Sequence, residues 1–247
     1  MENEKIDIVI PLGSESFSNN LELRLALRSI NRFAAGAGNI WIVGETIPHW
    51  LQNIRHLPIP DKHRHNKDAN IIDKLSAAVN EKDLTSRFVF WSDDQAALHR
   101  FIVKNMVPVF NRRKRKDFTR ERMWHRRMRN TFDFLQQNNI NLNWNWDSHV
   151  PQIMEKSLFK KLMESVDYQK PPGYCVNTLY FGLARTPPRL EQSRIKTTCE
   201  AEQNYPFLPA ERLFLGYNDA ACRGNLLQLL MQYLPQRSIY EKDGIKI

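Results

Sequence analysis

The first ninety residues alternate between short apolar runs and helix-forming segments. In LELRLALRSINRF the apolar residues recur every two or three positions, whereas in IDIVIP they are nearly continuous. Strands that alternate with helices form parallel sheets, because a parallel pair needs a long crossover connection that is usually helical. The pattern predicts strands at 6–11, 39–44, 53–60 and 87–91, and helices at 21–33 and 69–81.

The fold class that follows from this alternation is α/β. We expect a Rossmann-like, doubly wound and mostly parallel sheet with helices on both faces and an elaborated C-terminal half. No linker-like segment interrupts the chain, so residues 1–247 are expected to form a single domain. In the C-terminal half the sequence predicts a strand that leads to a polar turn at 140–151, a helix at 155–166, a loop and then a strand at 170–182, and a helix at 220–235.

Composition narrows the class of protein. No run of eighteen apolar residues occurs in the chain, so no membrane-spanning helix is expected. The acidic start MENEKIDIV is not typical of a secretory signal. Cys175, Cys199 and Cys222 form no CxxC pair, which argues against a disulfide framework or a zinc ribbon. These features favour a reducing, cytoplasmic location.

Two adjacent carboxylates, Asp93 and Asp94, follow the predicted strand at 87–91 after a single serine. Ligands of parallel sheets bind at the carboxyl ends of the strands, which is where this pair is expected to lie. Two carboxylates side by side repel each other and raise one pKa, and a cation removes that cost. Mg²⁺ and Mn²⁺ bind one or two carboxylates together with phosphate oxygens, so the pair is a candidate metal site. An acidic turn or a helix cap is the alternative interpretation.

The segment DSHVP provides a second candidate. One residue separates Asp147 from His149, so in extended backbone both side chains point the same way. An imidazole and a carboxylate could complete the coordination of the same ion. The alternative is a histidine that satisfies a local turn.

Positive charge is concentrated in residues 112–129. The net charge is +9, and RRKRKDFTRERMWHRRMR holds ten Arg or Lys residues against two acids, with Trp124 and His125 interleaved. We expect a basic helix at 112–138 that binds phosphates and stacks bases, and a solvated basic face is the alternative. The candidate nucleic-acid-binding residues are Arg112, Arg113, Lys114, Arg115, Lys116, Arg126 and Arg127.

Several common motifs are missing from the sequence. It contains no GxGxxG, GxxxxGKS, HExxH or GxSxG. A glycine-fingerprint dinucleotide site, a P-loop, a zinc-protease helix and a hydrolase nucleophile elbow are therefore not expected.

An ordered set of segments resembles a known family. DIVIPLGS, LELRLALRSI, NIWIVGETIPHWL, NKDANIIDKL, RFVFWSDD, HVPQIMEKSLF and NTLYFG follow one another along the chain. The set resembles GT-A type nucleotide-sugar glycosyltransferases, and within them a group related to the Stealth sugar-phosphate transferases and to glycosyltransferase-like proteins of bacteriophages. The likeness covers about residues 5–185. It implies a nucleotide-sugar-binding half at 1–95 and an acceptor-binding half at 96–247.

The resemblance implies roles for individual residues. The acid pair would correspond to a DxD-like motif that holds Mn²⁺ or Mg²⁺ on the donor diphosphate, with Asp94 and His149 as metal ligands. The candidate catalytic carboxylates are Asp94, Asp147 and Asp219, of which Asp219 has helix capping as its alternative. The candidate nucleotide-sugar contacts are Pro11, Leu12, Gly13, Arg28, Lys67, Asp68, Asn70 and Asp93, of which Arg28 has bracing of its helix as its alternative.

The start of the chain departs from the Stealth relatives. Their aromatic-rich YTWVDG-type start is replaced by VIPLGSES, in which Glu15 is the only acid. This difference favours plain glycosyl transfer over sugar-phosphate transfer.

The function implied by the resemblance is a metal-dependent glycosyltransferase that uses a nucleotide sugar, with a UDP-sugar as the expected donor. The favoured acceptor is a hydroxymethylated pyrimidine in phage DNA, which an enzyme would flip out of the duplex. The expected location is the cytoplasm of a bacterium or of a phage-infected host. One alternative is a Stealth-like enzyme acting on a capsule or cell-envelope glycan. Another is a non-catalytic nucleic-acid-binding module. The sequence leaves the sugar, the stereochemistry and the oligomeric state open.

Overall fold

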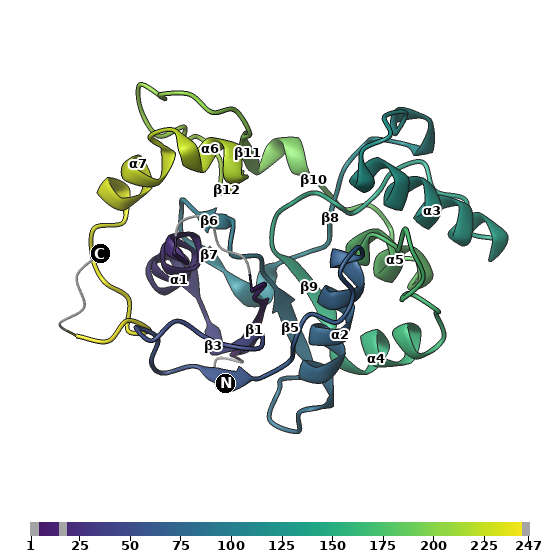
Figure 1. Cartoon of the computed structure of the whole chain (residues 1–247), viewed down its shortest axis with the longest axis horizontal. Helices are drawn as coiled ribbons and strands as arrows, with labels where there is room; N and C mark the ends of the chain where they lie inside the picture. The colour runs from purple at the N-terminus through teal and green to yellow at the C-terminus, as the bar shows by residue number, and fades with distance from the viewer. Residues whose placement is uncertain (1–4, 15–18, 244–247) are drawn as a thin grey trace.

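The computed structural model describes residues 5–14 and 19–243. Its centre is a five-stranded sheet in the order β4-β3-β1-β5-β9 (Figure 1). The first four of these strands are parallel, and β9 is antiparallel to β5. The chain is therefore mixed α/β with a mainly parallel central sheet, as the alternation predicts. The strands are β1 (Ile6–Pro11), β3 (Ala37–Val43), β4 (Arg55–Leu57), β5 (Arg87–Phe90) and β9 (Gln152–Glu155).

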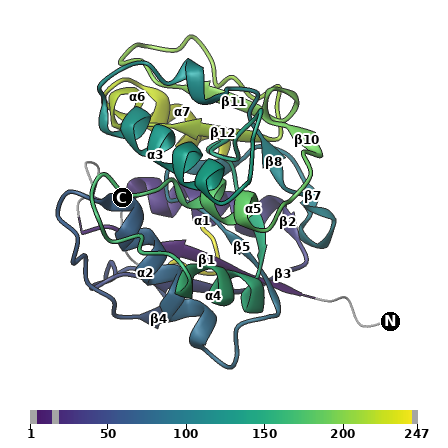
Figure 2. The ribbon, with the colours of Figure 1, turned by 90° about the vertical axis from the view of Figure 1, so that its right-hand side faces the viewer.

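Helices cover both faces of this sheet because β1 is apolar on both sides. Ile6, Ile8 and Ile10 pack in one core with Leu23 and Leu27 of α1 (Leu21–Phe33). The alternate residue Val9 lies in a second core with residues of α2 (Lys67–Asn80), α4 (Lys156–Glu164) and α5 (Val176–Leu183). Figure 2 shows α2 and α4 side by side on this second face.

A second sheet of three strands joins the central one through the acid pair. Its order is β11 (Lys196–Cys199), β12 (Phe214–Tyr217) and β6 (Gln95–Ala97), with β6 antiparallel to β12. Residues 91–94 connect β5 of the central sheet to β6 of the second sheet. Two short pairs complete the strands, namely β2 (Ala34–Ala35) with β7 (Phe101–Ile102), and β8 (Val109–Phe110) with β10 (Leu190–Glu191).

The C-terminal segment packs back onto α1. Leu25 of α1 shares a core with residues of α6 (Asp219–Arg223) and α7 (Leu226–Tyr233). The main core also draws on both halves of the chain, from Ile6 to Tyr240. Among the described residues, the helices are all too short or too polar to cross a bilayer.

Several predictions for the C-terminal half are wrong. The strand predicted at 170–182 is helix α5, preceded by a turn. Residues 140–151 form no strand apart from an isolated bridge of Asn145 to Asn111, and β9 begins only at Gln152. The helix predicted at 220–235 is broken into α6 and α7 at Gly224, where a Cβ would lie 2.1 Å from the Gln203 carbonyl oxygen.

The basic helix predicted at 112–138 is helical mainly in its second part. Residues 115–117 form one 3-10 turn, and α3 (Met123–Gln137) begins only after a further loop. Phe118, in that loop, is buried against Met128 and Phe132 of α3. The segment around Phe118 therefore packs against α3 and does not extend it.

Candidate functional site

Asp93 and Asp94 lie in a turn that hydrogen bonds from neighbouring residues hold in place. The Trp91 indole donates a hydrogen bond to the Gln95 carbonyl at 3.0 Å, and the Ser92 amide donates to the Gln95 side chain at 3.3 Å. The Tyr217 amide of β12 donates to the Asp94 carbonyl at 3.2 Å. The carboxyl end of β5 thus holds both acids where the two sheets meet, at the edge that binds ligands in parallel sheets.

His149 lies against Asp94. Its Nε2 is 3.3 Å from Oδ2 of Asp94, and the two side chains are 42% and 32% exposed. The backbone of His149 has φ = 52°, a left-handed conformation that a residue with a side chain seldom adopts. Burial works to lower the pKa of His149, but the charge of Asp94 and its hydrogen bond outweigh burial and raise it. The structure therefore brings together the two residues predicted as metal ligands.

Lys196 of β11 faces the same acids, and sequence reasoning missed it. A Cβ on Gly216 would lie 2.7 Å from the His149 ring and 2.9 Å from Cε of Lys196, so only glycine lets these side chains approach across β12. Burial lowers the pKa of Lys196 to about 8, against the opposing charges of Glu200 and Asp94. We call Asp93, Asp94, His149, Lys196 and Glu200 the strand-end cluster.

The surroundings of the acid pair disfavour the ionised form of Asp93. Burial raises the pKa of Asp93 to about 7, and the neighbouring charges of Asp94 and then Glu22 act in the same direction. Glu22 lies in the first turn of α1 and is buried. Asp93, Asp94 and Glu22 therefore lie close enough to disfavour ionisation of Asp93, while Asp94 is also in contact with His149.

Two buried oxygens beside the acid pair have no hydrogen-bond partner. They are Oδ1 of Asp94 and the hydroxyl of Tyr217. Burial, and after it the charge of Asp94, raises the pKa of that hydroxyl well above its usual value. Buried polar atoms are nearly always paired in folded proteins, so unpaired ones beside like charges indicate a place for a further group.

A divalent cation fits these residues. The described part of the chain has no group of three His, Cys, Asp or Glu side chains placed to hold a metal. A Mg²⁺ or Mn²⁺ site needs no such group, because one or two carboxylates suffice when phosphate oxygens and water complete the coordination. The unpaired oxygen of Asp94 has the ligand chemistry of such a site.

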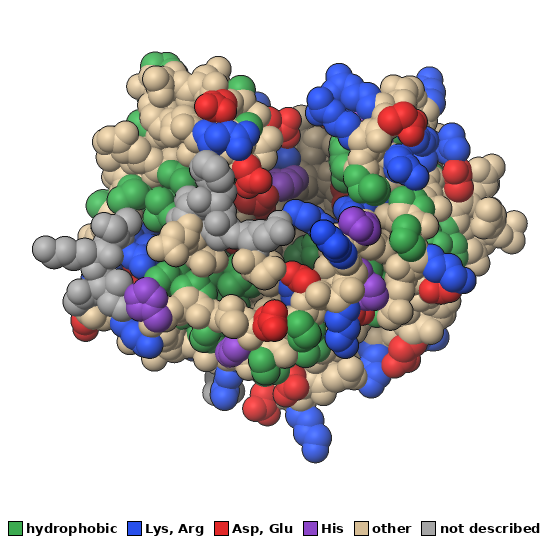
Figure 3. All heavy atoms as spheres, viewed as in Figure 1, with side chains coloured by type: hydrophobic (Ala, Val, Ile, Leu, Met, Phe, Trp, Pro, Cys, Tyr) green, Lys and Arg blue, Asp and Glu red, His purple; other side chains and the backbone are tan. Residues whose placement is uncertain are grey.

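The surface above this region is hollowed. Figure 3 shows a hollow between the part of the molecule that carries α6 and α7 and the part that carries α3, with acidic, histidine and basic side chains inside it. In the same view of the ribbon, β11 and β12 lie on one side of the hollow and α3 on the other (Figure 1). A ligand in the hollow would lie between α3 on one side and β11 and β12 on the other.

Pro11, Leu12 and Gly13, which are predicted to face a nucleoside, lie at the carboxyl end of β1. This is the same edge of the sheet as the acid pair. Pro11 is the last residue of β1, the Leu12 side chain is buried, and Gly13 is exposed. The Lys74 ammonium of α2 donates to the Leu12 carbonyl at 2.7 Å and to Asp61 at 2.6 Å. Lys74 therefore fixes the backbone of this loop. Glu15 lies outside the described residues.

Of the three candidates at the start of α2, two are occupied in internal contacts. The side-chain oxygen of Asn70 accepts from the amides of Lys62 and His63 at 2.9 and 2.8 Å, which shapes the loop before α2. Asp68 forms an ion pair with Arg127 at 2.8 Å. Lys67 is exposed at the first position of the helix. Asp68 and Asn70 thus brace the loop, and Lys67 alone is free to reach a ligand.

Asp147 lies in a different environment from the acid pair. Its carboxylate accepts hydrogen bonds from the hydroxyl and the amide of Thr178, near the start of α5. Burial raises its pKa to about 7, the Thr178 hydroxyl bond opposes this shift, and the charge of Asp68 adds to it. The charge of His149 also acts on Asp147 and lowers its pKa, although less than the other causes.

Arg28 and Asp219, both predicted as site residues, lie in different surroundings. Arg28 is buried, and its guanidinium donates to both carboxylate oxygens of Glu241, at 2.8 and 2.9 Å, and to the Leu234 carbonyl. It braces α1 against the C-terminal segment, which rules it out as a nucleotide contact. Asp219 is exposed at the first position of α6, where Asn218 provides the cap. Burial first, and then the charges of Glu22, Asp219 and the acid pair, raise the pKa of Cys222 to about 12.

The basic run is only partly available to a partner. Arg127 is buried and bonded to Asp68 and to the Pro172 and His65 carbonyls, so its prediction as a nucleic-acid contact is wrong. Arg112 pairs with Glu191 at 2.7 Å, and Arg115 pairs with Asp133. The guanidinium of Arg113 lies 4.4 Å from the centre of the Phe118 ring. Within the described run 112–129, the exposed side chains without a recorded ion pair or hydrogen bond are Lys114, Lys116, Arg120, Arg122 and Arg126.

Comparisons with protein-family models and with curated proteins found no match to this chain.

Proposed function

We propose that this protein is a nucleotide-sugar-dependent glycosyltransferase whose donor diphosphate binds at the strand-end cluster. The observation that carries the proposal is the unpaired, buried oxygen of Asp94 in a pair of repelling acids at the carboxyl end of β5. The unpaired oxygen and the repulsion between the two acids both destabilise the folded protein. A divalent cation bound to a diphosphate removes both effects, because it pairs with the oxygen and neutralises the acids. A purely structural acidic turn explains neither the unpaired oxygen of Asp94 nor the closeness of the two acids.

Each residue of the cluster has a role in this proposal. Asp94, with Asp93 beside it, would bind Mn²⁺ or Mg²⁺, which supplies Lewis-acid stabilisation of the leaving diphosphate. Lys196 would contact a phosphate oxygen as negative charge develops on it. Its ammonium is already partly desolvated, so its interaction with that charge is stronger than in water. His149 orients Asp94 through their contact.

Two carboxylates remain candidates for the base that activates an acceptor hydroxyl. Asp147 has a pKa raised to about 7, which suits general-base catalysis near neutral pH. Asp219 is the more accessible of the two. A retaining reaction would use neither in this way, so Asp147→Asn and Asp219→Asn variants separate the three cases by their effect on kcat.

The acceptor we favour is DNA that carries hydroxymethylated pyrimidines. The support is the group of exposed cations Lys114, Lys116, Arg122 and Arg126, which lie on α3 and in the segment before it. The part of the molecule that carries α3 borders the hollow (Figure 3). Trp124, which is 38% exposed, stands between two of these cations and offers a face for stacking. Donor recognition and acceptor recognition would then come from opposite sides of the hollow.

Slow hydrolysis of UDP-sugars in the presence of Mn²⁺ tests the enzyme assignment. We expect the wild-type protein to release UDP, and Asp94→Asn to release it at least about a hundredfold more slowly, because loss of a metal ligand removes transition-state stabilisation. The matched control is Asp83→Asn, which changes an exposed carboxylate after α2. Equal rates in wild type and Asp94→Asn would refute the role of the acid pair.

Hydroxymethylcytosine-containing DNA and unmodified DNA, each offered with the donor, test the acceptor by product mass. A mass gain of one sugar on the modified DNA alone supports the proposal. Donor turnover without any mass gain on modified DNA removes DNA as the acceptor and favours a glycan.

A further inference from the structure

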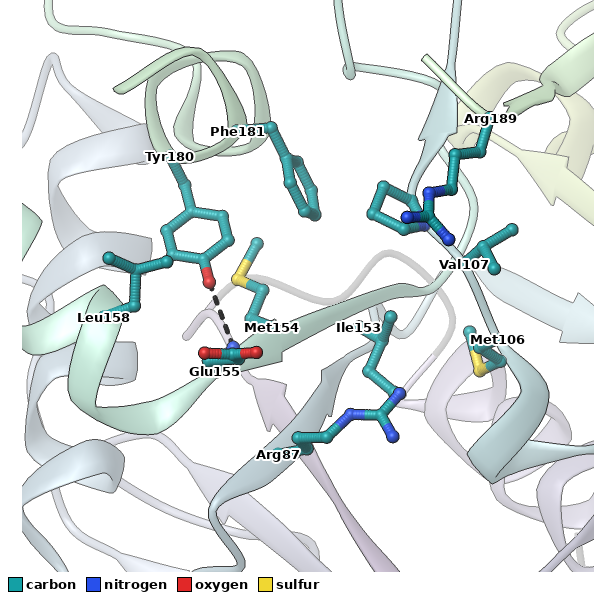
Figure 4. A pocket seen from close by; sticks show the side chains of 11 residues that line it. Arg87, Met106, Val107, Ile153, Met154, Glu155, Leu158, Tyr180, Phe181 and Arg189 are labelled. Atoms are coloured by element: carbon teal, nitrogen blue, oxygen red, sulfur yellow. Dashed lines mark hydrogen bonds between the residues drawn. The ribbon is translucent and has the colours of Figure 1, made fainter. Parts of the chain in front are cut away.

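A pocket of about 220 Å³ lies near the opposite end of β5 from the acid pair. β5 contributes Arg87, its first residue, and the antiparallel neighbour β9 contributes Ile153, Met154 and Glu155. The remaining walls come from α4, α5 and the segments before β8 and β10 (Figure 4). β5 spans about 13 Å, so a ligand in this pocket does not reach the acids at the other end.

The walls of the pocket divide into an aromatic side and a cationic side. Figure 4 shows Tyr180 and Phe181 on one side, Arg189 with Val107 on the opposite side, and Ile153 and Met154 between them. The Glu155 amide donates to the Tyr180 hydroxyl at 3.0 Å, which fixes the Tyr180 ring. The floor is therefore apolar and its aromatic edge is rigid.

The two arginines of the pocket are free to bind a ligand. The guanidinium groups of Arg87 and Arg189 make no recorded ion pair or hydrogen bond with other described residues. Glu155 is the one acid among the residues that line the pocket, so its lining carries a net charge of +1. Arg87 is half-buried and Arg189 is exposed. Unpaired guanidinium groups beside an apolar cavity match an anionic ligand.

We propose that this pocket binds a small amphipathic anion, whose apolar body packs against Phe181 and Met154 and whose carboxylate or phosphate group faces Arg87 and Arg189. The volume is below that of pockets for drug-sized ligands, which span about 300–1,000 Å³, so the body is one or two rings or a short chain. The apolar wall supplies hydrophobic contact, and the guanidinium groups supply charge-assisted hydrogen bonds. This site is independent of the proposed glycosyltransferase activity.

Binding of 2-naphthoate, measured by isothermal titration calorimetry and by saturation-transfer NMR, tests the proposal. We expect the wild-type protein to bind 2-naphthoate. The neutral 2-naphthylmethanol has a similar shape, and we expect its affinity to be at least about tenfold lower. The double variant Arg87→Gln/Arg189→Gln should bind 2-naphthoate about tenfold more weakly and leave 2-naphthylmethanol unchanged. 2-Naphthyl phosphate, run in parallel, shows whether a carboxylate or a phosphate is preferred.

The matched control is Arg100→Gln, which removes an exposed arginine outside the pocket and should leave the affinity unchanged. If the double variant fails to fold, Arg189→Gln alone carries the test, because Arg189 is exposed. No binding of 2-naphthoate to the wild-type protein, or equal affinity in wild type and the arginine variants, overturns the proposal.

Discussion

The acid pair shows how far single residues can be interpreted from sequence. Asp93 and Asp94 could be located from the sequence because they follow an apolar strand, and a strand end has a defined place in a parallel sheet. Lys196 and Glu200 could not, because they lie on and just after β11, whose sequence RIKTTCE lacks a clear strand pattern. Only the pairing of β11 with β12 brings them to the acids.

Replacement of Asp93 should change how stability depends on pH. In the folded protein Asp93 keeps its proton up to about pH 7, whereas in the unfolded chain it ionises near pH 4. Its contribution to stability is fully present below pH 4 and is lost as the pH rises through 7. Asp93→Asn cannot ionise, so in metal-free buffer we expect its unfolding temperature to exceed that of wild type at pH 8, with a smaller gap at pH 5.

Thermal unfolding followed by circular dichroism at the two pH values checks this prediction. Asp83→Asn, at an exposed site, should track the wild type at both. A gap between Asp93→Asn and wild type that is the same at pH 5 and pH 8 would mean that Asp93 ionises normally in the folded protein.

At the scale of elements, the prediction from sequence is accurate for β1, α1 and α2 and is wrong for α5. α1 and α2 alternate between apolar and polar faces, and their predicted bounds are close to those observed. α5 has the sequence VNTLYFGL and is buried over seven of its eight residues, so its apolar run has no polar face. A continuous apolar run fits a buried strand or a buried helix equally well, which explains why a strand was predicted.

The contact between α1 and the C-terminal segment depends on one buried carboxylate. Glu241 pairs with Arg28 at 2.8 Å and lies 3.7 Å from Arg24, and all three side chains are at most 7% exposed. Removal of one partner leaves buried charges uncompensated, which costs about 3–5 kcal/mol. We expect Glu241→Gln to lower the free energy of unfolding by about that amount, measured by urea denaturation.

The control for this prediction is Glu191→Gln. Its partner Arg112 is 75% exposed, so loss of this surface pair should cost less than about 1 kcal/mol. A loss in Glu241→Gln as small as in Glu191→Gln would show that the C-terminal segment contributes little to the stability of the fold.

At the scale of the whole molecule, the sequence indicated a basic surface but overestimated how much of it is free. The run 112–129 is uniformly basic in sequence, yet Arg127 pairs with Asp68 inside the fold, Arg112 pairs with Glu191 and Arg115 pairs with Asp133 of α3. Those partners become neighbours only through tertiary packing, so no local pattern reveals them. Lys114, Lys116, Arg122 and Arg126 are four of the exposed cations of the run for which no side-chain partner is recorded, and we propose them as phosphate contacts.

Replacement of these four cations by Gln should weaken DNA binding and reduce its dependence on salt. Each phosphate contact releases about 0.9 counterion on duplex DNA, so the slope of log K against log salt should fall in magnitude by up to about 4. Fluorescence anisotropy of labelled duplex over a range of NaCl concentrations measures this slope. Lys160→Gln/Lys161→Gln on α4 should leave it unchanged, and an unaltered slope in the fourfold variant would place DNA elsewhere.

The central claim is that a divalent cation and a nucleoside diphosphate bind together at the carboxyl end of β5, and calorimetric titration of UDP tests it most directly. We predict that UDP binds the wild-type protein in the presence of Mn²⁺, binds at least about tenfold more weakly with EDTA, and shows the same loss in Asp94→Asn with Mn²⁺ present. UDP affinity that is independent of Mn²⁺ and unchanged in Asp94→Asn, or no affinity for UDP or any other nucleoside diphosphate, would contradict the claim.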